Sequence, residues 1–122
     1  MDALFHIVDR SVWQNAVDRG VYSAESLGSE GFIHCSFASQ VAGVANARYR
    51  DVEGLCVVEL DPARLAAHVV VEDSYGSGTA YPHVYGSIHP TAAVRVHELP
   101  RDTGGDYWFS ASGAAGAASS DR

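Results

Sequence analysis

Short apolar runs alternate along the chain with stretches of helical spacing. Six runs rich in β-branched and aromatic residues predict β-strands: residues 4–8, 32–37, 55–60, 69–72, 81–85 and 92–99. Two stretches place apolar residues three and four apart and predict helices, residues 11–20 and 39–49. The first has a capping-box spacing at Ser11 and Gln14 and a terminating Gly20, and the second has Ser39 as its N-cap.

The segments between these elements complete the predicted architecture. Residues 21–30 and 73–79 are expected to be loops, and Asp61-Pro62 predicts a short helical turn. Several strands with two main helices packed on them indicate an α+β domain, and 122 residues suffice for one such domain. We expect the globular domain to span residues 1–101. Residues 102–122 are rich in Gly, Ala and Ser and are predicted to form a flexible tail, anchored at most by its Tyr-Trp-Phe triplet.

Charge and apolar content limit the possible partners. Fifteen acidic against eight basic residues give a formal net charge of -7, which opposes nucleic acid as a bulk partner but leaves a small anionic or dinucleotide ligand possible. No apolar run approaches the roughly 20 residues that cross a membrane, and the start lacks a secretory signal. We therefore expect a cytoplasmic protein without a membrane partner, in which Cys35 and Cys56 are reduced and buried.

Residues 31–36 combine a strand pattern with reactive side chains. Because side chains alternate along a strand, Cys35 shares a face with apolar neighbours, while His34 and Ser36 share the opposite face. One face of this strand is therefore expected to join the core, and the other to be available for chemistry.

Two further histidines, His6 and His83, lie in strand-like segments. A neutral imidazole offers one donor and one acceptor, which suits it to hold the hydroxyl groups of a sugar. If the strands of His6, His34 and His83 are neighbours, the three side chains line one cleft. The alternative for each of them is a core histidine whose ring nitrogens bond to backbone groups.

Tyr81 and Tyr85 flank His83 and share its face if the segment is extended. They predict an aromatic platform for a flat ring, with residues 73–79 as a lid over it. Two aromatic anchors of an ordinary loop would have the same sequence pattern, so this alternative stays open.

Metal and nucleophile chemistry compete for the same residues. His6, His34, His83 and Cys35 are all possible zinc ligands, but His34 and Cys35 point to opposite faces of a regular strand, and the chain has neither a CxxC pair nor an HExxH helix. We therefore expect no metal. Ser36 lacks the flanking glycines of a nucleophile elbow, and Cys35 is predicted to face the core, where a thiol is inert.

Five segments between residues 4 and 99 resemble, in order and spacing, a small bacterial family of unknown function. They are FHIV, EGFIHCS, QVAGVAN, LDPARL and PHVYG. That family is in turn distantly similar to ADP-ribosyltransferases, which bind NAD in a cleft between two small sheets. The resemblance implies a compact mixed or antiparallel split sheet and NAD as the cofactor or substrate.

The resemblance also implies roles for particular residues. In such transferases a histidine on an early strand holds the nicotinamide ribose, a position that His6 matches, and a following strand-to-helix block supplies a second contact, matched by His34 and Ser36. Many of these enzymes also carry a catalytic glutamate. Glu72 is the nearest candidate here, although it can equally be a solvated charge at a strand end.

We therefore expect a cleft for NAD or a related nucleotide, with a possible activity of the ADP-ribosyltransferase or NAD glycohydrolase type. The candidate catalytic residues are His6, His34 and Glu72. The candidate ligand-binding residues are His6, His34, Ser36, Tyr81, His83 and Tyr85. Two other classes stay open, namely a non-enzymatic binding or sensing domain and a small histidine- or metal-dependent enzyme.

Overall fold

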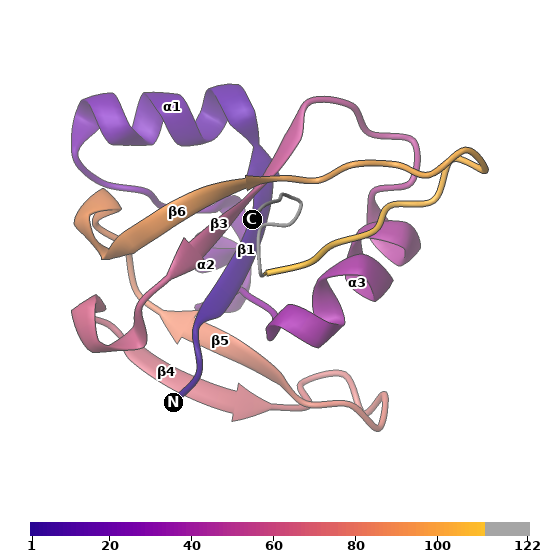
Figure 1. Ribbon diagram of the computed structural model, residues 1–122. Coiled ribbons are helices and arrows are strands. Elements are labelled where there is room, and N and C mark those ends of the chain that lie inside the picture. Colours follow the sequence, from indigo (N-terminus) through magenta and orange to yellow (C-terminus); the bar gives the residue numbers. More distant parts are fainter. Residues whose placement is uncertain (112–122) are drawn as a thin grey trace.

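Two small antiparallel sheets form the framework of the computed structural model, which describes residues 1–111 (Figure 1). The first sheet has the order β1 (Leu4–Asp9), β3 (Leu55–Leu60), β6 (Ala93–Glu98). The second has the order β2 (Ile33–His34), β5 (Tyr81–Tyr85), β4 (His68–Glu72). The predicted α+β class with antiparallel strands is confirmed.

The two sheets meet where the chain leaves β2. Cys35 still donates its backbone N–H to Pro82 of β5 at 3.1 Å, but Ser36 exchanges two backbone hydrogen bonds of 2.8 Å with Phe5 of β1. The predicted strand 32–37 is thus a short strand of one sheet followed by a bridge to the other. This crossing places Ser36 between the two sheets.

Three α-helices pack around the sheets, and one of them was not predicted. They are α1 (Arg10–Arg19), α2 (Glu25–Glu30) and α3 (Val41–Arg48). Helix α2 occupies most of the segment predicted as a loop, and it ends at Gly31, whose φ of 88° favours glycine. Its six residues are too few to show a helical period in the sequence.

The predicted helix starts also need correction. Asp9, rather than Ser11, caps α1, because its carboxylate accepts hydrogen bonds from the N–H groups of Ser11 and Val12 at 2.8 and 3.2 Å. The predicted end at Gly20 is confirmed. The second helix begins with a 3₁₀ turn (Ala38–Gln40), in which the Gln40 side chain accepts from the Phe37 N–H at 2.9 Å, so Ser39 is not the cap.

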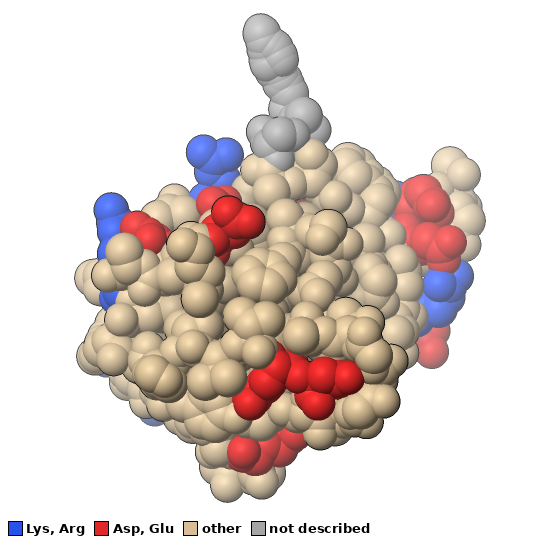
Figure 2. Space-filling model, turned by 90° about the horizontal axis from the view of Figure 1, so that it is seen from below, with Lys and Arg blue, Asp and Glu red and all other residues tan. Residues whose placement is uncertain are grey.

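The other short elements agree with the sequence. The Asp61-Pro62 turn is a 3₁₀ helix (Pro62–Arg64), capped by the Asp61 side chain, and another 3₁₀ turn (Pro90–Ala92) precedes β6. No helix of the described residues is long and apolar enough to cross a membrane. On the face shown in Figure 2, acidic side chains form several groups while basic ones lie near the edges.

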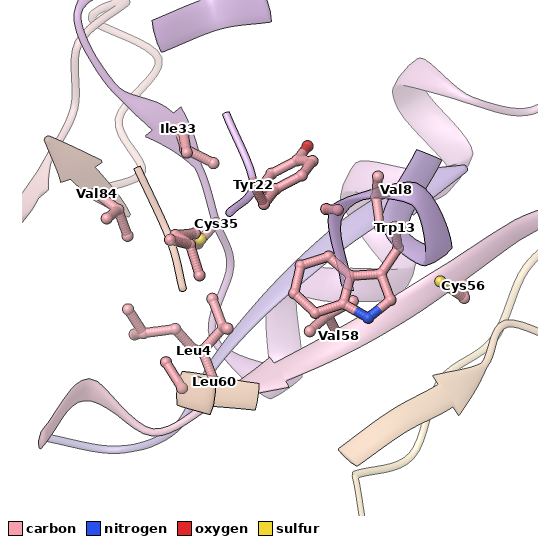
Figure 3. Close-up of a cluster of buried hydrophobic side chains, with 13 residues drawn as sticks. Leu4, Val8, Trp13, Tyr22, Ile33, Cys35, Cys56, Val58, Leu60 and Val84 are labelled. Atoms are coloured by element: carbon pink, nitrogen blue, oxygen red, sulfur yellow. The ribbon is translucent and has the colours of Figure 1, made fainter. Parts of the chain in front are cut away.

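The core has two parts, and the alternation of β1 separates them. Leu4 and Val8 belong to a cluster that also contains Ile33 and Val84 of the second sheet, and Figure 3 shows this cluster with Tyr22 within it. The odd-numbered β1 residues Phe5 and Ile7 belong to the other cluster, together with buried residues of α3. His6 therefore points toward the first cluster.

The predicted tail starts too early. Tyr107 is 5% exposed, and the Asn46 side chain bonds to its backbone N–H and C=O at 2.8 and 3.0 Å. The ring of Phe109 lies 5.4 Å from that of Phe5. Residues 102–111 thus extend the domain beyond the expected boundary at 101, and the rest of the predicted tail, 112–122, lies outside the described residues.

Candidate functional site

A cavity of about 320 Å³ lies where the two sheets separate. Its wall combines β1, the crossing segment 34–36, α3, the loop between β4 and β5, and β5 itself. Apolar and aromatic side chains make up much of this wall, and no carboxylate is among the described residues that line it. We refer to it as the site cavity.

Five of the predicted site residues line the site cavity: His6, His34, Ser36, Tyr81 and His83. The structure thus brings together three segments that lie far apart in the sequence. Glu72 and Tyr85 do not line it. They lie behind His83, where the Glu72 carboxylate accepts hydrogen bonds from both the His83 ring and the Tyr85 hydroxyl.

Both ring nitrogens of His6 are occupied by the protein. Nδ1 lies 2.6 Å from the backbone carbonyl of His34, which can only accept, so Nδ1 carries the proton and Nε2 accepts from the Tyr22 hydroxyl at 2.6 Å. Burial lowers the pKa of His6 to about 4, so the ring is neutral at pH 7. No ring nitrogen of His6 is left for the ribose contact that the family resemblance implies.

His34 belongs to a polar group at the cavity wall. Its Nε2 lies 2.9 Å from Oε2 of Glu30 and 3.4 Å from the Tyr75 hydroxyl, which donates to Glu30. These hydrogen bonds from Tyr75 and His34 lower the pKa of Glu30, and the bond to Glu30 raises the pKa of Tyr75. Tyr75 thereby attaches the predicted lid loop to the end of α2.

His83 is 2% exposed and held from several sides. Its Nδ1 lies 2.8 Å from Oε2 of Glu72 and 3.4 Å from the Ser74 hydroxyl, and its ring stacks on Phe32 with centroids 3.9 Å apart and planes 13° apart. Both of these hydrogen bonds are made by Nδ1, and the side chain lines the site cavity.

Ser36 and Cys35 lie side by side at the crossing between the sheets. Ser36 is 3% exposed and lines the site cavity, and its backbone N–H and C=O are both bonded to Phe5. Burial raises the pKa of the Cys35 thiol to about 12, so the thiol stays neutral. Cys35 packs in the core as predicted and also reaches the cavity wall.

Arg48 contributes the cationic side chain of the cavity wall. Its guanidinium lies 5.8 Å from the centre of the Tyr75 ring, and its positive charge contributes to the lowered pKa of Glu30. Arg48 follows Val44 by four residues, so both lie on one face of α3. Sequence reasoning did not name Arg48 or Glu30 as site residues. The spacing of Arg48 from Val44, and that of Glu30 from His34, is four residues and could have pointed to them.

The described residues contain no group of three His, Cys, Asp or Glu side chains arranged to hold one metal ion. Cys35 and Cys56 are both free and buried.

Comparison with known proteins identifies the family. Residues 7–96 match the family described as "Protein of unknown function (DUF952)", so the chain belongs to that family. Solved structures similar to it are those of CC0527 from Caulobacter crescentus. The crystal structure is 24% identical with a TM-score of 0.77, covering 88% of this chain and 94% of that one. The solution NMR structure is 25% identical with a TM-score of 0.71, covering 87% and 91%.

These similarities establish the fold and the family, and the names of these relatives assign no activity. None of the curated proteins matches the chain. The structures named above are not of ADP-ribosyltransferases, so that part of the resemblance rests on the sequence motifs.

Proposed function

We propose that the protein binds NAD or a related nucleotide in the site cavity. The observation that carries this proposal is the wall of the site cavity, where Ser36, His83 and Arg48 lie together with aromatic side chains. A serine hydroxyl at this wall can both donate a hydrogen bond to a bound ligand and accept one from it.

The chemistry of the cavity wall suits a nucleotide. Ser36 and His83 offer hydrogen-bonding atoms for ribose hydroxyl groups, and Tyr75 and Tyr81 offer aromatic faces for a planar base. Arg48 is the expected contact for a phosphate, because a guanidinium binds phosphate oxygens in pairs. The volume suits one nucleoside half of a dinucleotide, with the other half extending past Arg48.

The experiment is calorimetry with NAD, ADP-ribose and nicotinamide at millimolar concentration. We expect NAD and ADP-ribose to bind, and Ser36→Ala and His34→Ala to abolish binding with little change in melting temperature. His68→Ala is the matched control, since His68 is exposed and does not line the cavity. The affinity of this variant for NAD and ADP-ribose should equal that of the unchanged protein.

Two results would overturn this proposal. One is the absence of heat with all three ligands. The other is a Ser36→Ala protein that binds NAD as tightly as the unchanged protein, because the buried hydroxyl would then have no part in recognition. If His34→Ala instead unfolds while its folded fraction still binds, His34 is structural.

Binding alone is compatible with a sensing domain, and release of free nicotinamide from NAD separates an enzyme from that alternative. A small histidine-based enzyme is the second candidate function, and the observation that favours it is the carboxylate-bound His83 at the cavity wall.

The cytoplasm stays the proposed compartment, supported by two free, buried cysteines.

A further inference from the structure

We propose that His83 acts as a general base on the ligand in the site cavity, and that Glu72 is the residue that positions it. This inference rests on the proposed function, since it requires the nucleotide to occupy that cavity. It differs from the role that the family resemblance implies, in which a glutamate itself contacts the ribose.

Hydrogen bonding determines which nitrogen of His83 is available. The pKa of Glu72 is lowered by hydrogen bonds from Tyr85 and His83, so its carboxylate is ionised and can only accept. The proton of neutral His83 must therefore be on Nδ1, 2.8 Å from Oε2 of Glu72. Nε2 keeps its lone pair, since the hydrogen bonds of the ring to Glu72 and Ser74 are both made by Nδ1.

The surroundings hold the imidazole in one orientation. Phe32 stacks on one face of the ring at 3.9 Å, and the Glu72 carboxylate is itself bonded by the Tyr85 hydroxyl. A carboxylate on the far nitrogen of a histidine fixes the tautomer and stabilises the imidazolium that forms when the ring takes up a proton. The same pairing recurs in catalytic histidines because it combines both effects.

The other histidines near the cavity lack this combination. Both nitrogens of His6 are bonded to protein, and Nε2 of His34 is bonded to Glu30. A second buried pair exists, in which Nε2 of His97 lies 2.7 Å from Oε1 of Glu59. His97 does not line the site cavity, so this pair has the same chemistry without access to the ligand.

The reaction that these groups support is hydrolysis of the bond between nicotinamide and ribose. His83 Nε2 removes a proton from water as the water oxygen forms a bond to C1′ of the ribose. The electrons of the breaking C–N bond go to the nicotinamide nitrogen, which loses its positive charge. The products are ADP-ribose and neutral nicotinamide, and the imidazolium returns its proton to solvent.

The test compares Glu72→Gln and His83→Gln with Glu59→Gln as the matched control. Glu59 and Glu72 pair with buried histidines at 2.7 and 2.8 Å, and their side chains are 22% and 29% exposed. We expect the first two substitutions to lower the kcat for nicotinamide release by about 10²-fold or more, because general-base catalysis is worth this much. Glu72→Gln should leave NAD binding nearly unchanged, since Glu72 does not line the site cavity. Glu59→Gln should leave kcat unchanged.

A second readout does not depend on turnover. Long-range ¹H–¹⁵N NMR distinguishes the two neutral tautomers of each histidine, and we expect the Nδ1–H form at His83. An Nε2–H tautomer in the unchanged protein would overturn the inference, and so would equal loss of kcat in all three variants.

The two proposals fail in different ways. If NAD does not bind in calorimetry, the proposed function is wrong and the inferred reaction falls with it. If NAD binds but the unchanged protein releases no nicotinamide, the proposed function stands and the catalytic role of His83 is wrong.

Discussion

The imidazole of His6 is buried and neutral, and this makes the stability of the fold depend on pH. Burial is the main cause of its lowered pKa, and the nearby His34 ring adds to the lowering while the His34 carbonyl opposes it. The remaining nitrogen accepts from Tyr22. Protonating His6 would place a charge in the core and break this bond.

The expected effect follows from the folded-state pKa of about 4 against the ordinary histidine pKa of 6.5. Between these two pH values the unfolded state binds a proton that the folded state does not. The contribution of His6 to the free energy of unfolding is therefore complete above pH 6.5 and is lost as the pH falls toward 4. The free energy of unfolding should fall by about 3 kcal/mol over this range. Urea unfolding at pH 7 and pH 4.5 measures it.

A His6→Gln variant should show a smaller loss between the two pH values, because the titrating group is gone. His68→Gln is the control, since His68 is exposed and should leave the dependence as it is. A His6→Gln protein with the full pH dependence would show that another group is responsible.

At the scale of single elements, the loop between β4 and β5 is organised by its own first residue. The Asp73 carboxylate accepts from the N–H groups of Ser77 and Gly78 at 2.9 and 2.7 Å, which lowers the pKa of Asp73. Tyr75 at the loop tip then reaches Glu30. The predicted lid is thus a loop with defined internal bonds, and it contributes Tyr75 and Ser77 to the cavity wall.

The end of β5 is packed closely against the segment before β4. A Cβ at Gly86 would lie 2.8 Å from that of Ala67, so Gly86→Ala should destabilise the protein by about 1–3 kcal/mol through overpacking. Urea unfolding of the variant measures this change. The glycine of the PHVYG segment is therefore needed for close approach.

Gly28→Ala is the matched control for this substitution. Gly28 lies within α2, and a Cβ there meets nothing within 4 Å, so the change should stabilise the protein by about 0.5–1 kcal/mol through helix propensity. Equal effects of the two alanine substitutions would contradict the close contact at Gly86.

At the scale of the whole molecule, the segment after β6 closes the core beside β1. Tyr107 is buried, its hydroxyl bonds to the Val52 carbonyl, and the Arg101 guanidinium lies 4.0 Å from the centre of its ring. This segment covers the core cluster that holds Phe5 and Ile7, and both of these residues also line the site cavity. The segment therefore supports one wall of the site.

Tyr107→Ala should destabilise the protein by about 3 kcal/mol, as expected for removing a large buried aromatic side chain. Trp108→Ala is its control, because Trp108 is 44% exposed and should change stability by about 0.5 kcal/mol or less. Thermal or urea unfolding of both variants provides the comparison. If Tyr107→Ala and Trp108→Ala lowered stability by similarly small amounts, residues 102–111 would not belong to the cooperative domain.

Local pattern was sufficient for most strands and for the faces of the side chains. The alternation in residues 31–36 placed Cys35 with the core, because alternation depends only on backbone geometry. His34 and Ser36 line the site cavity, and Cys35 also reaches its wall. Helix α2 was missed because six residues show no period, and the cap at Asp9 was missed because that residue also ends a strand.

The amino-acid sequence by itself determined the α+β class, most of the strands, two of the helices and the residue types available for a site. Only the tertiary structure decided which of these residues share a cavity and which atoms stay free. That decision depends on contacts between segments far apart in the chain. The Ser36–Phe5 bridge joins the two sheets, His34 and Tyr22 occupy the nitrogens of His6, and Glu72 orients His83. Strand alternation produces a local period in the sequence, but pairing between distant segments produces none.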